Sequence, residues 1–100
     1  MDRLGIFVGS DRFPEYFQAL AVAAGEMGLN VHLHFFGAGV RLVHGVDFDQ
    51  LPASSRITIC RDSVARLQLD DGPSSLWRRW LVPSGQLARA IQMCDRHLFL

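Results

Sequence analysis

The stretch "RITICRDSVARL", residues 56–67, combines two kinds of secondary structure in one short segment. Residues 57–59 are a short run of β-branched residues, which predicts a strand. Asp62 and Ser63 follow Cys60 almost at once, and they are side chains that favour the start of a helix. Cys60 therefore lies where a predicted strand passes into a predicted helix, as in a βα unit of a parallel sheet.

The residues that precede this stretch show the same order of a strand followed by a helix. Residues 4–8 form a continuous apolar run, and the turn-forming Gly9, Ser10 and Asp11 follow it. Apolar residues at helical spacing predict an amphipathic helix over 14–27, with Pro14 in its first turn. Gly28 supplies the stop signal. We expect a buried strand, a loop and then a helix.

Residues 30–36 predict a second strand because apolar and polar positions alternate. One face of this strand carries His32, His34 and Phe36. The glycines Gly37 and Gly39 break the strand. Later segments continue the pattern in the order of a short helix at 40–43, a loop over 44–55 with at most one helical turn, a strand at 56–60, a helix at 62–69, a loop at 70–75, a strand at 76–82, a helix from 83 and a strand at 97–100.

This alternation predicts one α/β domain over residues 1–100. We expect a three-layer α/β/α sandwich with a mostly parallel sheet of about five strands. In such sheets ligands and reactive groups gather beyond the carboxyl ends of the strands. Cys60 lies at one such end, and residues 9–11 and 37–39 lie at two others.

Composition excludes several classes of function. The formal net charge is zero, all ten basic residues are arginine, and they form no basic stripe, so we expect no direct binding to nucleic acid. No apolar run is long enough to span a membrane. The first residues lack the pattern of a secretory signal, so the expected location is cytoplasmic.

Cys60 is the first candidate for chemistry. A side chain between a strand end and a helix start lies near free backbone N–H groups, which favour the thiolate. Arg61 and Arg56 are the nearest cations in the sequence, and a cation that faced the sulfur would stabilise the thiolate further. The alternative is that Cys60 is a buried small hydrophobe. A hydrolytic cysteine enzyme fits less well because no histidine shares a known motif with Cys60.

The two strand-end loops have alternative interpretations. The loops with Gly9, Ser10, Asp11, Gly37 and Gly39 are either a small-ligand or phosphate cradle or simple tight turns. Neither matches a dinucleotide or P-loop fingerprint.

The remaining polar and aromatic candidates are His32, His34, Cys94 and the pair Trp77 and Trp80. The two histidines share a strand face but lack a third ligand, so we expect a solvated or subunit-facing surface and no metal. Cys94 lies on the apolar face of the last helix and is expected in the core. The two tryptophans flank an arginine pair, which suits either a subunit interface or the edge of the core.

Four stretches together resemble the DsrE/TusD-like sulfur-relay family (DsrE/DsrF-like domain). They are residues 18–28, "VHLHFFGAGVRLV" at 31–43, "ITICRDSVARL" at 57–67 and "SGQLARAIQMCDRHLFL" at 84–100. Two departures stand out: the chain is shorter than the family between residues 44 and 56, and Arg61 and Asp62 replace small apolar residues after the cysteine.

The resemblance implies that Cys60 receives sulfane sulfur as a persulfide and passes it on, for tRNA thiolation or sulfur oxidation. It implies sulfur-donor and sulfur-acceptor proteins as partners and assembly into homo- or hetero-oligomers (dimers, trimers or hexamers). No metal or organic cofactor is implied. Two alternatives stay open: a non-catalytic assembly subunit with Cys60 buried, and a small-ligand-binding module that uses the strand-end loops.

Overall fold

The structure is a computed structural model that describes residues 2–69 and 79–100. Its five strands form one sheet in the order β4-β3-β2-β1-β5, and every neighbouring pair is parallel. The strands are β1 (Arg3–Val8), β2 (Asn30–Phe35), β3 (Arg56–Cys60), β4 (Leu81–Val82) and β5 (Arg96–Phe99). The predicted α/β fold with a parallel sheet of five strands is confirmed.

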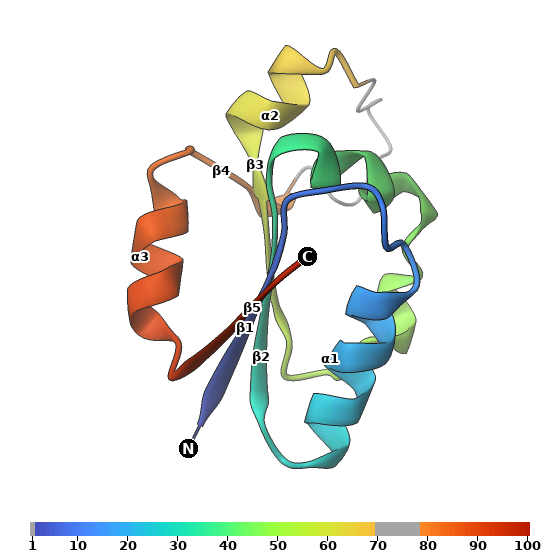
Figure 1. Ribbon diagram of the computed structural model, residues 1–100, viewed down its shortest axis with the longest axis vertical. Helices are drawn as coiled ribbons and strands as arrows, with labels where there is room; N and C mark the ends of the chain where they lie inside the picture. Colours follow the sequence, from blue (N-terminus) through green and yellow to red (C-terminus); the bar gives the residue numbers. More distant parts are fainter. Residues whose placement is uncertain (1, 70–78) are drawn as a thin grey trace.

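Helices cover both faces of this sheet (Figure 1). The α-helix α1 (Tyr16–Glu26) and the 3₁₀ helix η1 (Gly37–Gly45) pack on one face, and α3 (Gln86–Met93) packs on the other. A short 3₁₀ turn, η2 (Phe48–Gln50), follows η1. The short helix α2 (Arg61–Arg66) continues directly from β3 beyond the carboxyl end of the sheet.

The two faces of the sheet have different cores. The face beneath α1 is fully apolar, and its strands contribute Ile6, Leu33, Phe35 and Ile59, none of which is exposed to solvent. The face beneath α3 has a smaller apolar cluster of Phe7, Ala90 and Cys94. Alternation along each strand explains the division, because neighbouring residues point to opposite faces.

Most element boundaries agree with the sequence-based expectations within a few residues. Gly28 ends α1 with a φ of +79°, a backbone conformation that glycine adopts without steric cost. The strand expected at 76–82 extends over only Leu81–Val82 within the described part, and Pro83 follows, which lacks the N–H needed to continue a ladder. Residues 76–78 of that expected strand lie outside the described residues. Across the ranges that the structure describes, no helix is both long and apolar enough to span a bilayer.

Candidate functional site

Cys60 ends β3 and immediately precedes α2. Cys60 is only 5% exposed to solvent, but it borders a cavity of about 320 Å³ at the carboxyl end of the sheet. Its lining mixes polar and apolar groups from β2, α2 and the start of α3: His34, Asp62, Ser63, Arg66 and Ser84, with Phe36, Gly37 and Leu87. Cys60 is thus largely buried from bulk water and adjoins a hollow that has both charged and apolar side chains in its lining.

The cations near Cys60 differ from those that the sequence suggested. Arg66 lines the cavity, whereas the exposed Arg61 does not. Arg56 begins β3, four residues before Cys60, and the rise of a strand separates their Cα atoms by roughly 13 Å. Arg56 lines a different cavity. Asp62 also borders the Cys60 cavity, so one carboxylate and one guanidinium face it from α2.

A hydrogen bond between α2 and η1 shapes one wall of this cavity. The backbone N–H of Gly37 donates to Ser63 Oγ over 2.8 Å. Gly37 has a φ of +53°, which glycine allows and which turns the chain from β2 into η1. Ser63 is buried, so the bond holds the start of η1 against α2 and fixes the position of the cavity wall.

The strand-end glycine loops are tight turns whose N–H groups are already bonded. Gly9 and Ser10 both donate to the carbonyl of Leu100, and Gly39 donates to the carbonyl of Phe36. A Cβ at Gly39 would lie 2.0 Å from the Val8 carbonyl oxygen, so this position needs glycine for close packing. These N–H groups are therefore not free to cradle a phosphate, and Asp11 is exposed outside the cavity.

His32 and His34 are buried, so the expectation of a solvated or subunit-facing surface was wrong. They are 5% and 1% exposed and lie under α3. Thr58 on β3 lies opposite His34 in the register. Its Oγ1 is 2.9 Å from His32 Nε2 and 2.6 Å from His34 Nδ1. Thr58 was not among the candidates found from the sequence, although its alternation with two isoleucines indicates that it shares a face with Cys60.

Burial keeps both imidazoles neutral at neutral pH. Loss of hydration lowers the pKa of His34 from 6.5 to about 4. The pKa of His32 is lowered from 6.5 to about 4, first by burial and then by the charges of Arg56, His34 and Arg3. In residues 2–69 and 79–100, no three His, Cys, Asp or Glu side chains come together as a possible metal site.

Cys94 lies in the small core cluster under α3, as its place on an apolar helix face predicts. Burial raises the pKa of its thiol above the usual value. A Cβ added at Gly5 would lie 2.9 Å from Cys94 Sγ, so β1 packs closely against this sulfur. Both cysteines are free thiols. Cys94 therefore differs from Cys60 in that β1 packs closely against its sulfur, and it lines none of the cavities described for residues 2–69 and 79–100.

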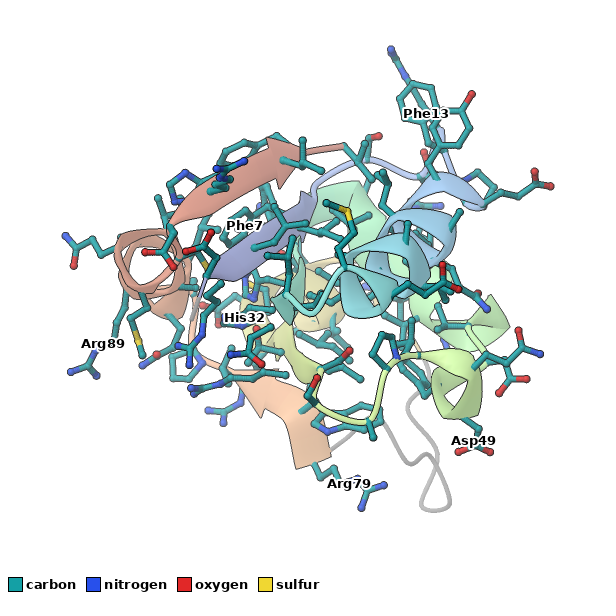
Figure 2. All side chains as sticks on the ribbon, turned by 90° about the horizontal axis from the view of Figure 1, so that it is seen from below. Phe7, Phe13, His32, Asp49, Arg79 and Arg89 are labelled. Carbon is teal, nitrogen blue, oxygen red and sulfur yellow. The ribbon has the colours of Figure 1, made fainter. Side chains whose placement is uncertain are left out.

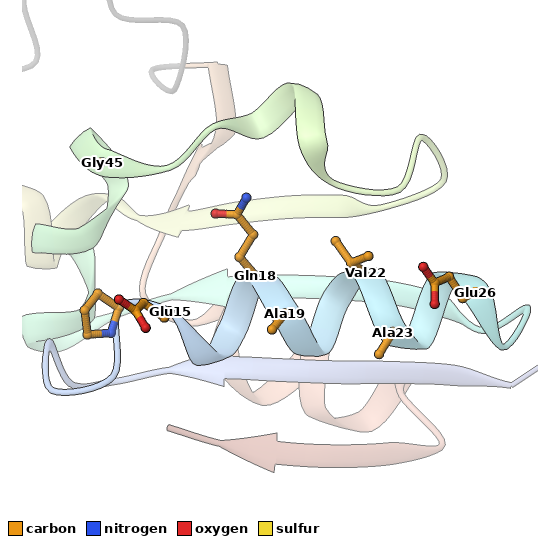
Figure 3. A pocket seen from close by; sticks show the side chains of 8 residues that line it. Glu15, Gln18, Ala19, Val22, Ala23, Glu26 and Gly45 are labelled. Carbon is orange, nitrogen blue, oxygen red and sulfur yellow. The ribbon is translucent and has the colours of Figure 1, made fainter.

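The largest hollow described is a different feature. Its volume is about 760 Å³, and it runs along the outer side of α1 near Gly45 (Figure 3). Among the described residues that line it, the charged groups are the two carboxylates Glu15 and Glu26, and none is a nucleophile such as Cys or Ser. Gln18 in this groove bonds Gln50 over 3.1 Å. Size alone therefore does not identify the reactive site.

Trp80 packs against the larger core and contacts Phe48, with a distance of 4.7 Å between the ring centroids. The guanidinium of the exposed Arg79 lies 5.0 Å from the Trp80 ring. Trp80 thus covers the edge of the core, which is one of the two expected roles. Trp77 and Arg78 lie outside the described residues.

No protein-family model matches this chain, and no curated protein matches it. The DsrE/TusD-like resemblance therefore remains an expectation from the four quoted stretches.

Proposed function

We propose that the protein is a sulfur-relay subunit that accepts sulfane sulfur on Cys60 and passes it to an acceptor thiol. The observation that carries the proposal is the position of Cys60 at the carboxyl end of β3, beside a cavity with a guanidinium in its lining. The parallel α/β sheet and the DsrE-like stretches agree with this function. A cytoplasmic, reducing compartment would keep both cysteines as free thiols.

The chemistry needs only a thiolate and a docked donor. The Cys60 thiolate attacks the outer sulfur of a donor persulfide, R–S–SH. A new S–S bond forms on Cys60, the donor S–S bond breaks, and R–S⁻ leaves and takes up a proton. An acceptor thiolate then attacks the outer sulfur on Cys60 and releases the Cys60 thiolate. Sulfur is transferred without a net oxidant or reductant, and the proposal needs no metal or organic cofactor.

Arg66 and Asp62 have opposite effects on this thiolate. A positive charge in the cavity favours the sulfur anion, and a negative charge disfavours it. Both side chains come from α2 and line the cavity. We infer that Arg66, in place of the sequence candidates Arg61 and Arg56, stabilises the sulfur anion.

Mass spectrometry after incubation with a protein persulfide donor tests the proposal. The intact protein should gain one sulfur atom, 32 Da, mapped to the Cys60 peptide. Cys60→Ser should lose the gain, and the matched control Cys94→Ser should keep it. A gain that survives Cys60→Ser, or no gain with a donor that loads another acceptor in the same assay, would rule out the relay.

The charge assignment has its own matched pair on one helix. Arg66→Gln should slow sulfur loading of Cys60 about 3- to 10-fold, because a positive charge that favours the thiolate is removed from the cavity lining. Arg61→Gln removes an exposed arginine of α2 that does not line the cavity, and it should leave the rate unchanged. Equal effects of the two substitutions would contradict the assignment to Arg66.

The second candidate is a non-catalytic assembly subunit on the same fold. The low exposure of Cys60 favours it, because a thiol that no partner reaches cannot exchange sulfur. Such a subunit would form the same homo- or hetero-oligomers but would gain no sulfur from any donor. The donor experiment therefore distinguishes the two functions.

A further inference from the structure

Three buried side chains form a continuous hydrogen-bonded chain across β2 and β3. Thr58 Oγ1 contacts His32 Nε2 on one side and His34 Nδ1 on the other. The three residues are between 1% and 7% exposed. This chain is the main polar feature under α3, and it runs along the same face of the sheet as Cys60.

Each end of the chain borders a cavity. The His34 ring lines the Cys60 cavity. His32 and Thr58 line a second cavity of about 280 Å³ between β3 and α3. No described residue hydrogen-bonds the outer ring nitrogens, Nε2 of His34 and Nδ1 of His32. The chain therefore joins two hollows through groups that both donate and accept protons.

The hydroxyl of Thr58 gives the chain a direction. A hydroxyl has one proton, so it donates to one neutral imidazole and accepts an N–H from the other. Two arrangements exist. In one, His34 has a bare Nε2 facing its cavity; in the other, that nitrogen carries a proton. Moving a proton along the chain converts one arrangement into the other.

Cys60 is close enough to start such a transfer. The register pairs His34 with Thr58, and Cys60 lies two residues further along β3 on the same face. Strand spacing and rise put the Cα atoms of His34 and Cys60 roughly 8 Å apart. Two inward-facing side chains, with at most one water between them, can bridge that separation.

We propose that His34, Thr58 and His32 form a proton relay between Cys60 and the second cavity. The proposal rests on the sulfur-relay function above. The Cys60 thiol gives its proton to His34 Nε2, and His34 Nδ1–H passes a proton to Thr58. The Thr58 hydroxyl proton moves to His32 Nε2, and His32 Nδ1–H releases a proton to water. One proton enters and one leaves, all three side chains end neutral, and Cys60 becomes a thiolate.

Transfer to the acceptor resets the chain. When the acceptor thiolate takes the outer sulfur, Cys60 leaves as a thiolate and takes a proton back along the same path. A complete cycle of loading and unloading thus restores the first arrangement. The protons move in concert, so that no imidazolium forms at any stage, which agrees with the low pKa of both rings.

The charges around the chain favour release at the His32 end. His32 feels the positive charges of Arg56 on β3 and Arg3 on β1. Arg89 of α3 lines the same cavity, and Figure 2 shows it extending from α3 at the edge of the molecule, while His32 lies further inside. Arg66 and Asp62 of α2 face the His34 end. The positive potential of these arginines disfavours an extra proton on His32, so that the proton is released to water.

Single-turnover sulfur loading at pH 7 tests the relay in the intact protein. Thr58→Val keeps the shape of the side chain but removes the hydroxyl, and it should slow loading at least about tenfold. Thr58→Ser keeps the hydroxyl and should stay within about twofold of wild type. His97→Gln, a change at an exposed histidine that bonds the Ile91 carbonyl, serves as the control and should have no effect.

Nitrogen-15 NMR of the histidine rings gives a readout that a structural role alone would not affect. As Cys60 is ionised by raising the pH, His34 and His32 should exchange their protonated nitrogens together. His32→Gln, which can bond Thr58 but cannot pass the proton on, should abolish the change at His34. This variant also serves if Thr58→Val does not fold.

The outcomes separate the two proposals. Wild-type loading rates in Thr58→Val and His32→Gln, or ring tautomers that do not respond to Cys60, would overturn the relay. If Cys60 gains no sulfur in any protein, the sulfur-relay function fails. The coupled tautomer change would in that case still show that the three side chains conduct the Cys60 proton.

Discussion

The two faces of the sheet are built from the same strands but from different chemistry. Along β2, Leu33 and Phe35 point toward α1 and are fully buried among apolar side chains. The alternate residues His32 and His34 point toward α3 and bond Thr58. The face beneath α1 provides most of the hydrophobic stabilisation, and the face beneath α3 holds the buried His–Thr–His group, the two cavities that it borders and Cys60.

This difference explains how so short a chain keeps a polar interior. Burying a polar group is costly unless it is hydrogen-bonded. Thr58 meets this requirement for two histidines at once, and it lies on the less apolar face, where α3 adds only a small hydrophobic cluster. A stable apolar layer on one side thus supports a more polar layer on the other.

The substitutions Phe35→Ala and Phe36→Ala test the difference between the two faces, and Phe35→Ala should have the largest effect on stability of the changes considered. The two neighbours point to opposite faces. Phe35 is fully buried in the larger core, so its truncation should lower the free energy of unfolding by about 3–5 kcal/mol. Phe36 is partly buried and borders the Cys60 cavity, so its truncation should cost about 1–2 kcal/mol.

Denaturant unfolding measures both values. Phe36→Ala should also make Cys60 react faster with alkylating reagents, because it widens the cavity. Equal losses of stability from the two substitutions would contradict the division into a stabilising face and a reactive face.

Acidification should weaken the face beneath α3 selectively. The two imidazoles have pKa values of about 4 in the folded protein, against an ordinary 6.5. The unfolded chain therefore binds more protons between pH 6.5 and 4, and stability falls as the pH falls through that window. The two histidines together should lower the free energy of unfolding by about 3 kcal/mol across this window, after allowance for partial solvation.

Unfolding experiments at pH 7 and pH 4.5 measure this loss. The double variant His32→Gln with His34→Gln should show a smaller decrease between these two pH values, since only the remaining titratable groups contribute to it. A decrease as large as that of wild type would mean that the histidines are not the cause.

Glycine substitutions give a smaller effect at the carboxyl end of the sheet. Gly39→Ala places a methyl group against the Val8 carbonyl, and overpacking of this kind costs about 1–3 kcal/mol. The control Gly45→Ala meets no atom within 4 Å, and it should change stability by less than about 1 kcal/mol. Thermal unfolding of the two variants compares them, and a Gly39→Ala protein as stable as Gly45→Ala would contradict the packing of η1 against β1.

The sequence predicted the face beneath α1 better than the face beneath α3. Apolar runs and their spacing depend on local chemistry, so the strands at residues 4–8 and 56–60 and the helix at 14–27 were predictable. The bond between Thr58 and two histidines depends on the register of β3 against β2, which no local pattern contains. The choice of Arg66 over Arg61 likewise depends on the rotation of α2 about its axis.

The measurement that tests the central claim most directly is the alkylation rate of each cysteine in the native protein. Exposure alone gives no preference for Cys60, because Cys60 is 5% exposed and Cys94 is 7% exposed. The cavity beside Cys60 and the raised pKa of Cys94 predict that iodoacetamide labels Cys60 at least about tenfold faster at pH 7.5. Equal labelling of the two cysteine peptides, at the rate of global unfolding, would contradict a reactive Cys60 thiol.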